Sequence, residues 1–146
     1  MLTQSEFGEI LKQKKEFIEN TEIKLGPHPI KWSREIASKE TRETFLMDFT
    51  RNSIKLAKYS VNKRYHKTVI LIRYCSDVPH TNPEEFDGKY FPGSHLHLYK
   101  EGFDDKIAVD PTEIGIDSTD SMEIVINKLL EYFNVLNIPS IQIDLF

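Results

Sequence analysis

The stretch Thr44-Phe45-Leu46-Met47-Asp48-Phe49-Thr50 decides the fold, because apolar and polar side chains alternate along it. Successive side chains of an extended strand point to opposite faces, so Phe45, Met47 and Phe49 share one face. This alternation is typical of a strand that packs one face on a core. We therefore expect a strand over residues 44–50.

Strand patterns continue on both sides of this stretch. The run Thr68-Val69-Ile70-Leu71-Ile72 is rich in β-branched residues, which suits a central strand buried on both faces. Further strands are expected over residues 30–33, 54–58, 95–99, 106–109 and 141–145, with a turn at residues 51–53 and a long irregular loop over residues 76–94. Because the neighbouring strands are joined by short turns, antiparallel meander pairing is expected.

Helical patterns stand toward both ends of the chain. Residues 4–19 begin with a capping-box pattern made by Thr3 and Glu6, and Gly26-Pro27-His28-Pro29 breaks the chain after them. The apolar face of this helix is expected to hold Phe7, Ile10, Leu11, Phe17 and Ile18. A second helix is expected from residue 118 or 119 until Asn137 and Pro139 end it. Its apolar stripe consists of Met122, Val125, Ile126, Leu129, Leu130 and Phe133.

These elements predict an α+β fold, with a single antiparallel β-sheet flanked by an N-terminal and a C-terminal helix. The 146 residues have the size of one domain, which we expect to span residues 1–146. The single cysteine, Cys75, excludes an internal disulfide and fits a reducing cytosol. No signal-peptide pattern and no long apolar stretch is present. We therefore expect a cytoplasmic protein without a membrane partner.

Charge is spread unevenly along the chain. The net charge of −4 argues against unselective binding to nucleic acid. Residues 55–73 nevertheless carry six cations and no acid: Lys55, Lys58, Lys63, Arg64, Lys67 and Arg73. Residues 101–123 are strongly acidic, with Lys106 as the only cation. The basic part can meet phosphate and the acidic part can meet a basic partner, whereas both can also be solvated surface.

The segment Gly93-Ser94-His95-Leu96-His97-Leu98-Tyr99 is the strongest candidate for chemistry. Alternation in a strand places His95, His97 and Tyr99 on one face, opposite the two leucines. Residues two apart lie about 6.6 Å apart along a strand, so both histidines can reach one substrate or one metal ion. Histidine also titrates near neutral pH without help.

Three interpretations of this segment stay open. The polar face can simply be structural. The histidines can bind a metal ion, with His80 as third ligand if the loop folds back, which would resemble a catalytic zinc site with an open fourth position. The third interpretation is metal-free acid–base cleavage of RNA by His95 and His97. A cation must then stabilise the phosphate, and Arg73 and Lys100 are candidates.

Other residues of the central region carry weaker signals. Asp77 and His80 can orient each other, although Asp77, Thr81 and Asn82 are also ordinary turn residues. Cys75 continues an apolar strand, and we expect it to be buried and inert. Trp32 can stack on a base but is more often a core residue.

Two groups of motifs carry a resemblance to known families. One is the segment of residues 42–51; the other combines Ile72-Arg73-Tyr74, Pro79-His80-Thr81-Asn82-Pro83 and residues 93–102. The chain resembles a family of small uncharacterised bacterial proteins found in Gram-positive chromosomes, prophages and mobile elements. More remotely, it resembles the TumE-type toxins of toxin–antitoxin pairs, which are suspected of acting on RNA. Relatives carry an acid two residues after the arginine, where this chain has Cys75.

The function expected from the sequence is that of a small toxin-like ribonuclease without a cofactor or a metal ion. His95 and His97 act as acid and base, and His80 and Tyr99 orient them. Arg73 and Lys100 hold phosphate, and Arg64 and Lys67 add substrate-binding charge. Its partners would be RNA and a cognate antitoxin. The alternative is a non-enzymatic inhibitor from a mobile element, an anti-CRISPR, anti-defence or antitoxin-like protein that binds a host protein through the acidic stretch.

Overall fold

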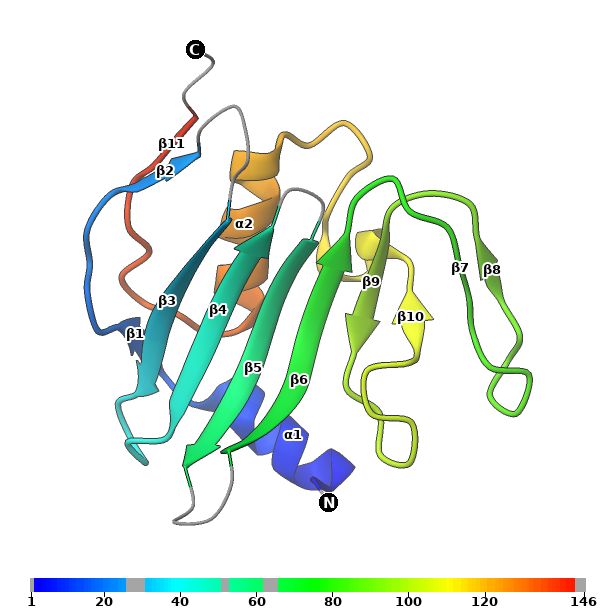
Figure 1. Ribbon diagram of the computed structural model, residues 1–146, viewed down its shortest axis with the longest axis horizontal. Helices are drawn as coiled ribbons and strands as arrows, with labels where there is room; N and C mark the ends of the chain where they lie inside the picture. The colour runs from blue at the N-terminus through cyan, green and yellow to red at the C-terminus, as the bar shows by residue number, and fades with distance from the viewer. Residues whose placement is uncertain (1, 26–30, 51–52, 62–65, 144–146) are drawn as a thin grey trace.

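A seven-stranded sheet dominates the computed structural model, which describes residues 2–25, 31–50, 53–61 and 66–143 (Figure 1). The strand order is β1-β3-β4-β5-β6-β9-β10, and every neighbouring pair is antiparallel. The strands are β1 (Lys15–Phe17), β3 (Lys31–Ser38), β4 (Thr44–Thr50), β5 (Ser53–Val61), β6 (His66–Cys75), β9 (His95–Leu98) and β10 (Ala108–Val109).

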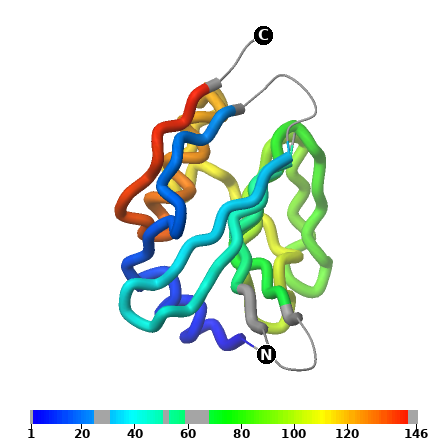
Figure 2. Tube along the Cα trace, turned by 60° about the vertical axis from the view of Figure 1, so that its left-hand side comes forward, coloured from blue at the N-terminus to red at the C-terminus, as the bar shows by residue number. Residues whose placement is uncertain are grey.

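Two α-helices, one 3-10 helix and two small strand pairs complete the described part of the structure. The helices are α1 (Gln4–Lys12), α2 (Met122–Tyr132) and the 3-10 helix η1 (Pro111–Ile114); β2 (Ile23–Leu25) pairs in parallel with β11 (Ile141–Ile143), and β7 (His80–Thr81) forms a hairpin with β8 (Tyr90–Phe91). Helices α1 and α2 and the β2–β11 pair lie on one side of the sheet (Figures 1 and 2). The predicted α+β fold, a meander sheet with an N-terminal and a C-terminal helix, is confirmed.

The core lies between this face of the sheet and the helices. In β4, Phe45, Met47 and Phe49 are buried as their alternation predicts. Helix α2 contributes its predicted apolar stripe, and the Phe133 ring that follows it meets Phe45 edge to face with 5.2 Å between ring centres. Trp32 is a partner of this core, stacked on Phe49 at 5.4 Å.

A bulge between β5 and β6 changes which side chains face the core. Leu56 pairs with Ile72 and Ala57 pairs with Ile70, so Leu71 has no partner in β5. Both Leu71 and Ile72 are therefore core residues, although they are adjacent in the chain. The expected burial of the whole run 68–72 on both faces is wrong at its beginning, because Thr68 is exposed.

The N-terminal helix is shorter than predicted. The capping box of Thr3 and Glu6 is present, but α1 ends at Lys12, and the residues that follow form β1 against β3. Lys15 turns its ammonium group inward to carbonyl groups at the ends of both helices, which a continuing helix would not allow. As a result Phe17 is buried, but Ile18, expected on the apolar face, is 55 % exposed.

Other boundaries shift for local reasons. Helix α2 begins at Met122 with Ser121 as its N-cap, because the carboxylate of Asp117 already accepts from the backbone of Thr119 in a separate turn. It ends at Tyr132, five residues before the expected end, since Asn134 adopts a left-handed conformation (φ 62°).

Several strand predictions also change. The strand expected over residues 30–33 runs on to Ser38, and the irregular loop 76–94 contains the β7–β8 hairpin. The last predicted strand exists as β11 but pairs with β2, outside the main sheet. Some of the predicted positions lie outside the described residues: the Gly-Pro-His-Pro segment, residues 30, 51 and 52, and Leu145. Within the described ranges, no helix is long and apolar enough to cross a membrane.

Candidate functional site

The two histidines of β9 lie on the face of the sheet that points away from the helices. His97 is the direct partner of Arg73 across β6 and β9, and His95 is the partner of Cys75. The intervening Leu96 is fully buried in the core on the other face. The predicted alternation of β9 is therefore correct for these residues, and it sets two imidazoles beside a guanidinium and a thiol.

The β7–β8 hairpin places a third imidazole against the first two. The ring of His80 is stacked on that of His95, with centres 5.1 Å apart, and meets that of His97 edge to face at 4.6 Å. The rings of His95 and His97 are 4.8 Å apart. We call His80, His95 and His97 the histidine cluster. His95 is only 2 % exposed and His97 only 1 %, so the strand face that carries them is covered.

Asn82 attaches the hairpin to strand β10. Its side-chain oxygen accepts from the backbone N–H of Ala108 (2.7 Å), and its amide nitrogen donates to the Ala108 carbonyl (2.9 Å). The same oxygen is 2.9 Å from Nε2 of His80. Because this oxygen can only accept, His80 must carry a proton on Nε2. The sequence indicated only a turn role for Asn82. The expected contact between Asp77 and His80 is absent, because among the described residues their side chains are not hydrogen-bonded to each other.

Hydrogen bonding also fixes the proton of His95. Its Nδ1 lies 3.1 Å from the carbonyl of Gly93, so Nδ1 donates and Nε2 keeps a free lone pair. In His97, Nδ1 is buried and has no hydrogen-bond partner among the described residues. Such an atom is uncommon in a folded protein, and ordered water or an ion usually binds it.

Burial keeps the imidazoles of β9 uncharged. Burial lowers the pKa of His95 below its usual value. Burial, followed by the nearby charge of Arg73, lowers the pKa of His97 to about 3. Burial also raises the pKa of the Cys75 thiol. At neutral pH these shifts favour uncharged imidazoles, which offer lone pairs.

Cys75 completes a set of metal-binding atoms with these two histidines. Within the described part of the chain, one ligand atom each from Cys75, His95 and His97 lies within 4.8 Å of the others. The sequence correctly indicated that Cys75 is buried, but it did not suggest a ligand role. The pairing of Cys75 with His95 depends on the register between strands β6 and β9, which cannot be read from the sequence.

The expectation that Tyr99 shares one face of the sheet with the two histidines is wrong. Tyr99 belongs to the core, 5.7 Å from the ring of Phe7, and its hydroxyl donates to the carbonyl of Leu2. Its backbone N–H donates to Leu71, the residue that the bulge turns toward the core. The register change therefore carries Tyr99 to the other face.

The two predicted cations whose side chains are described, Arg73 and Lys100, have different surroundings. A terminal nitrogen of Arg73 lies 3.4 Å from a carboxylate oxygen of Asp105, while its Nε is buried without a partner among the described residues. Lys100 is exposed and belongs to a turn that its backbone closes with Asp104. Arg64 and the side chain of Lys67 lie outside the part of the chain that the structure describes.

The acidic stretch 101–123 is used partly for local structure. Asp110 caps η1 and Asp117 holds a turn, and bonds to Thr112 and Thr119 lower the pKa of these two carboxyls. Asp120 pairs with Lys128 at 2.5 Å. These three carboxylates therefore have structural partners within the protein and are not all free to bind a basic partner.

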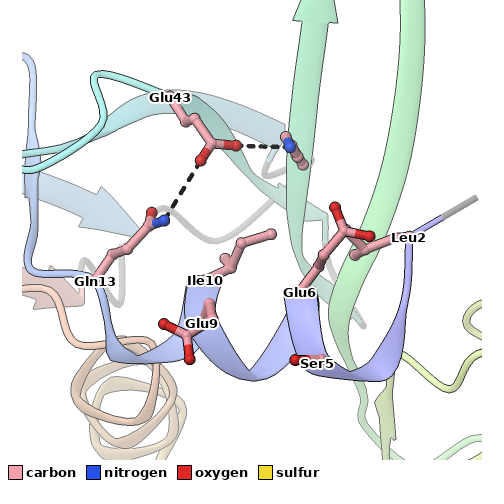
Figure 3. Close-up of a pocket in the computed structure, with 8 residues that line it drawn as sticks. Leu2, Ser5, Glu6, Glu9, Ile10, Gln13 and Glu43 are labelled. Atoms are coloured by element: carbon pink, nitrogen blue, oxygen red, sulfur yellow. Dashed lines mark hydrogen bonds and ion pairs between the residues drawn. The ribbon is translucent and has the colours of Figure 1, made fainter.

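A separate pocket opens between α1 and the strands β4 and β5 (Figure 3). Its volume is about 180 Å³, and Glu43 in its wall pairs with Lys58 at 2.6 Å. It contains none of the residues that the sequence indicated for chemistry.

Comparison with known proteins places the chain in a family but gives it no activity. No curated protein and no solved structure matches it. A family of unknown function, DUF6978, matches residues 2–135, which covers every helix and all of the main sheet. The chain therefore belongs to the family of unknown function DUF6978.

Proposed function

We propose that this protein binds a divalent transition-metal ion of the zinc class through Cys75, His95 and His97. Two observations carry the proposal: one ligand atom each from Cys75, His95 and His97 lies no more than 4.8 Å from the others, and His97 has a buried, unpartnered Nδ1. An ion bound there would satisfy that nitrogen.

The donor set suits such an ion. A thiolate with two imidazoles is a soft-to-borderline set, which favours zinc over magnesium or calcium. His95 already donates its other ring nitrogen to a backbone carbonyl, as metal-bound histidines usually do. The lowered pKa values keep both imidazoles uncharged and ready to bind. Ligand atoms around tetrahedral zinc are roughly 3.6 Å apart, so binding requires only a modest inward movement.

The Cys75 thiol must lose its proton on binding. Burial opposes this in the free protein, but a bound metal ion deprotonates a coordinating thiol outright. Asp105 offsets the positive charge of Arg73 beside the site, which reduces repulsion of the incoming ion.

The test is competition for Zn²⁺ between the protein and a chromophoric chelator. Wild type is expected to take up one equivalent, and Cys75→Ser and His97→Gln are expected to lose that uptake while keeping a native circular dichroism spectrum. Ser53→Ala is the matched control, because Ser53 is the partner of Cys75 on β5 but no ligand. Equal uptake by wild type and Cys75→Ser would refute the proposed site.

Cleavage of RNA is the second candidate function. The observation that favours it is the guanidinium of Arg73 directly across from His97, where it can stabilise a phosphate in its transition state. The resemblance to TumE-type toxins points the same way. The covered imidazoles would require the β7–β8 hairpin to open before RNA could reach them.

Expression in a bacterial host tests this candidate. Growth and total RNA integrity would be compared between wild type and the His95→Ala, His97→Ala double variant. RNA cleavage that the double variant lacks supports the ribonuclease, and intact RNA with both proteins argues against it. Cleavage that persists in a chelator would assign acid–base rather than metal chemistry.

A further inference from the structure

Building on the metal site, we infer that the open coordination position of the bound ion takes a phosphate oxyanion, which Arg73 holds from the neighbouring strand. The described ligand set has three members, Cys75, His95 and His97, whereas zinc commonly takes four. His80 covers the cluster but is not one of the three residues whose ligand atoms lie within 4.8 Å of one another, and its Nε2 is engaged with Asn82 and the Lys106 carbonyl. A fourth, exogenous ligand is therefore expected, and it would reach the covered imidazoles only when the β7–β8 hairpin opens.

Arg73 has an unused donor at this position. One terminal nitrogen of its guanidinium group pairs with Asp105, and its Nε is buried without a partner among the described residues. The other notable unpartnered atom, Nδ1 of His97, belongs to the residue directly across from Arg73. Cross-strand partners lie about 5 Å apart at Cβ. A metal ion on His97 with a bound oxyanion would satisfy both atoms at once.

The surroundings favour a phosphate over a simpler anion. Lys55 is the partner of Arg73 on β5, so an ammonium group follows the guanidinium along the same row across the sheet. A bound metal ion, the guanidinium group of Arg73 and the ammonium group of Lys55 would give an anion three positively charged partners. Such an arrangement suits a tetrahedral anion with several oxygens, and metal ions and arginine are the usual protein partners of phosphate.

The row also contains groups that limit its charge. Asp48 is the partner of Lys55 on β4 and is hydrogen-bonded to the hydroxyl of Ser33, while Asp105 pairs with Arg73. The Arg73 Nε remains available because the Asp105 contact uses a terminal nitrogen. Because Lys55 and Arg73 are balanced by Asp48 and Asp105, the bound metal ion would supply the net positive charge that retains an anion.

Co²⁺ provides the probe, because its visible spectrum reports thiolate binding and changes with the fourth ligand. The protein is loaded with less than one equivalent of Co²⁺ and titrated with inorganic phosphate or dimethyl phosphate. We expect a saturable change of the wild-type spectrum. In Arg73→Gln, phosphate should bind at least roughly tenfold more weakly, as expected for loss of a charge-assisted hydrogen bond. Arg34→Gln is the matched control, because Arg34 lies on the other face and bonds to Thr21.

Each outcome separates the two proposals. If wild type shows no thiolate-to-cobalt absorption, the metal site itself fails. If Co²⁺ binds but phosphate leaves the wild-type spectrum unchanged, or acts equally on Arg73→Gln, the metal site stands and the oxyanion inference is overturned. A response to inorganic phosphate alone identifies a free or terminal phosphate, and a response to dimethyl phosphate as well includes the diester of a nucleic acid.

Discussion

The ammonium group of Lys15 donates to the backbone carbonyl of Phe133 at 2.6 Å and lies 4.1 Å from the centre of the same residue's ring. It also donates to the carbonyls of Ile10 and Gln13. The fully buried Lys15 thus caps the C-terminal ends of both α1 and α2. At such ends carbonyl groups lack partners within the helix, and the helix dipole favours a positive charge.

Replacing Lys15 by methionine should destabilise the protein strongly. The substitution keeps the aliphatic stem but leaves three carbonyl groups without their donor, which we expect to cost about 2–5 kcal/mol. Urea unfolding followed by circular dichroism measures the loss. Lys14→Met is the control, since Lys14 is exposed and its substitution should stay within about 0.5 kcal/mol of wild type. Equal stability of the two variants would contradict the capping role.

The contribution of Lys15 to stability should rise with pH. Burial lowers the pKa of Lys15 from 10.5 to about 8. Between these values the unfolded chain binds more protons than the folded one, so stability increases with pH across this window. The measurement is the difference in unfolding free energy between wild type and Lys15→Met at pH 7.5 and at pH 9.5. Taking the difference removes the opposite trend of Cys75, whose raised pKa lowers stability above pH 9. A difference that does not grow would show that the carbonyl groups keep Lys15 protonated.

Zinc should stabilise the folded protein through the proposed site. A ligand that binds only the folded state at one hundred times its dissociation constant adds about 2.7 kcal/mol to the free energy of unfolding. Thermal unfolding with and without Zn²⁺ should therefore show a higher Tm with the ion, reversed by a chelator. The increase should be absent in Cys75→Ser, and an undiminished increase there would place the ion elsewhere.

Removing the side chain of Asn82 should release the β7–β8 hairpin from the sheet. Asn82 is only 1 % exposed and satisfies both backbone groups of Ala108 while holding His80. In Asn82→Ala those groups lose their partners, at a cost of about 2–4 kcal/mol. Amide hydrogen exchange should become faster in residues 80–91. Asn20→Ala, at an exposed position, should change neither stability nor exchange.

The sequence was most informative where one local signal dominates. The alternation of β4, the capping box of Thr3 and the apolar stripe of α2 each depend on neighbouring residues alone, and each is present in the structure. It was least informative where distant segments compete. Residues 13–17 have a helical pattern, but Lys15–Phe17 form the strand β1. In this conformation Lys15 donates to the carbonyl of Phe133, which is distant in the sequence.

The candidate site shows the same division. Alternation placed His95 and His97 on one face correctly. Their burial depends on how the 76–94 loop folds, and the position of Cys75 beside His95 depends on register between β6 and β9. Tyr99 faces the core because of the bulge at Leu71, and no residue type in the sequence predicts a bulge there. Asn82, whose side chain contacts His80, is also an ordinary turn residue, so its type alone does not predict that contact.

The parallel pairing of β2 with β11 has a consequence for synthesis on the ribosome. Ile23 is aligned with Ile141, and the side chain of Asn134 donates to the carbonyl of Lys12, 122 residues away in the chain. Lys12 and β2 therefore lack these partners until residues 134–143 have been synthesised. Because closing such long loops slows folding, we expect nascent chains to stay open to chaperones until the C-terminal strand has emerged.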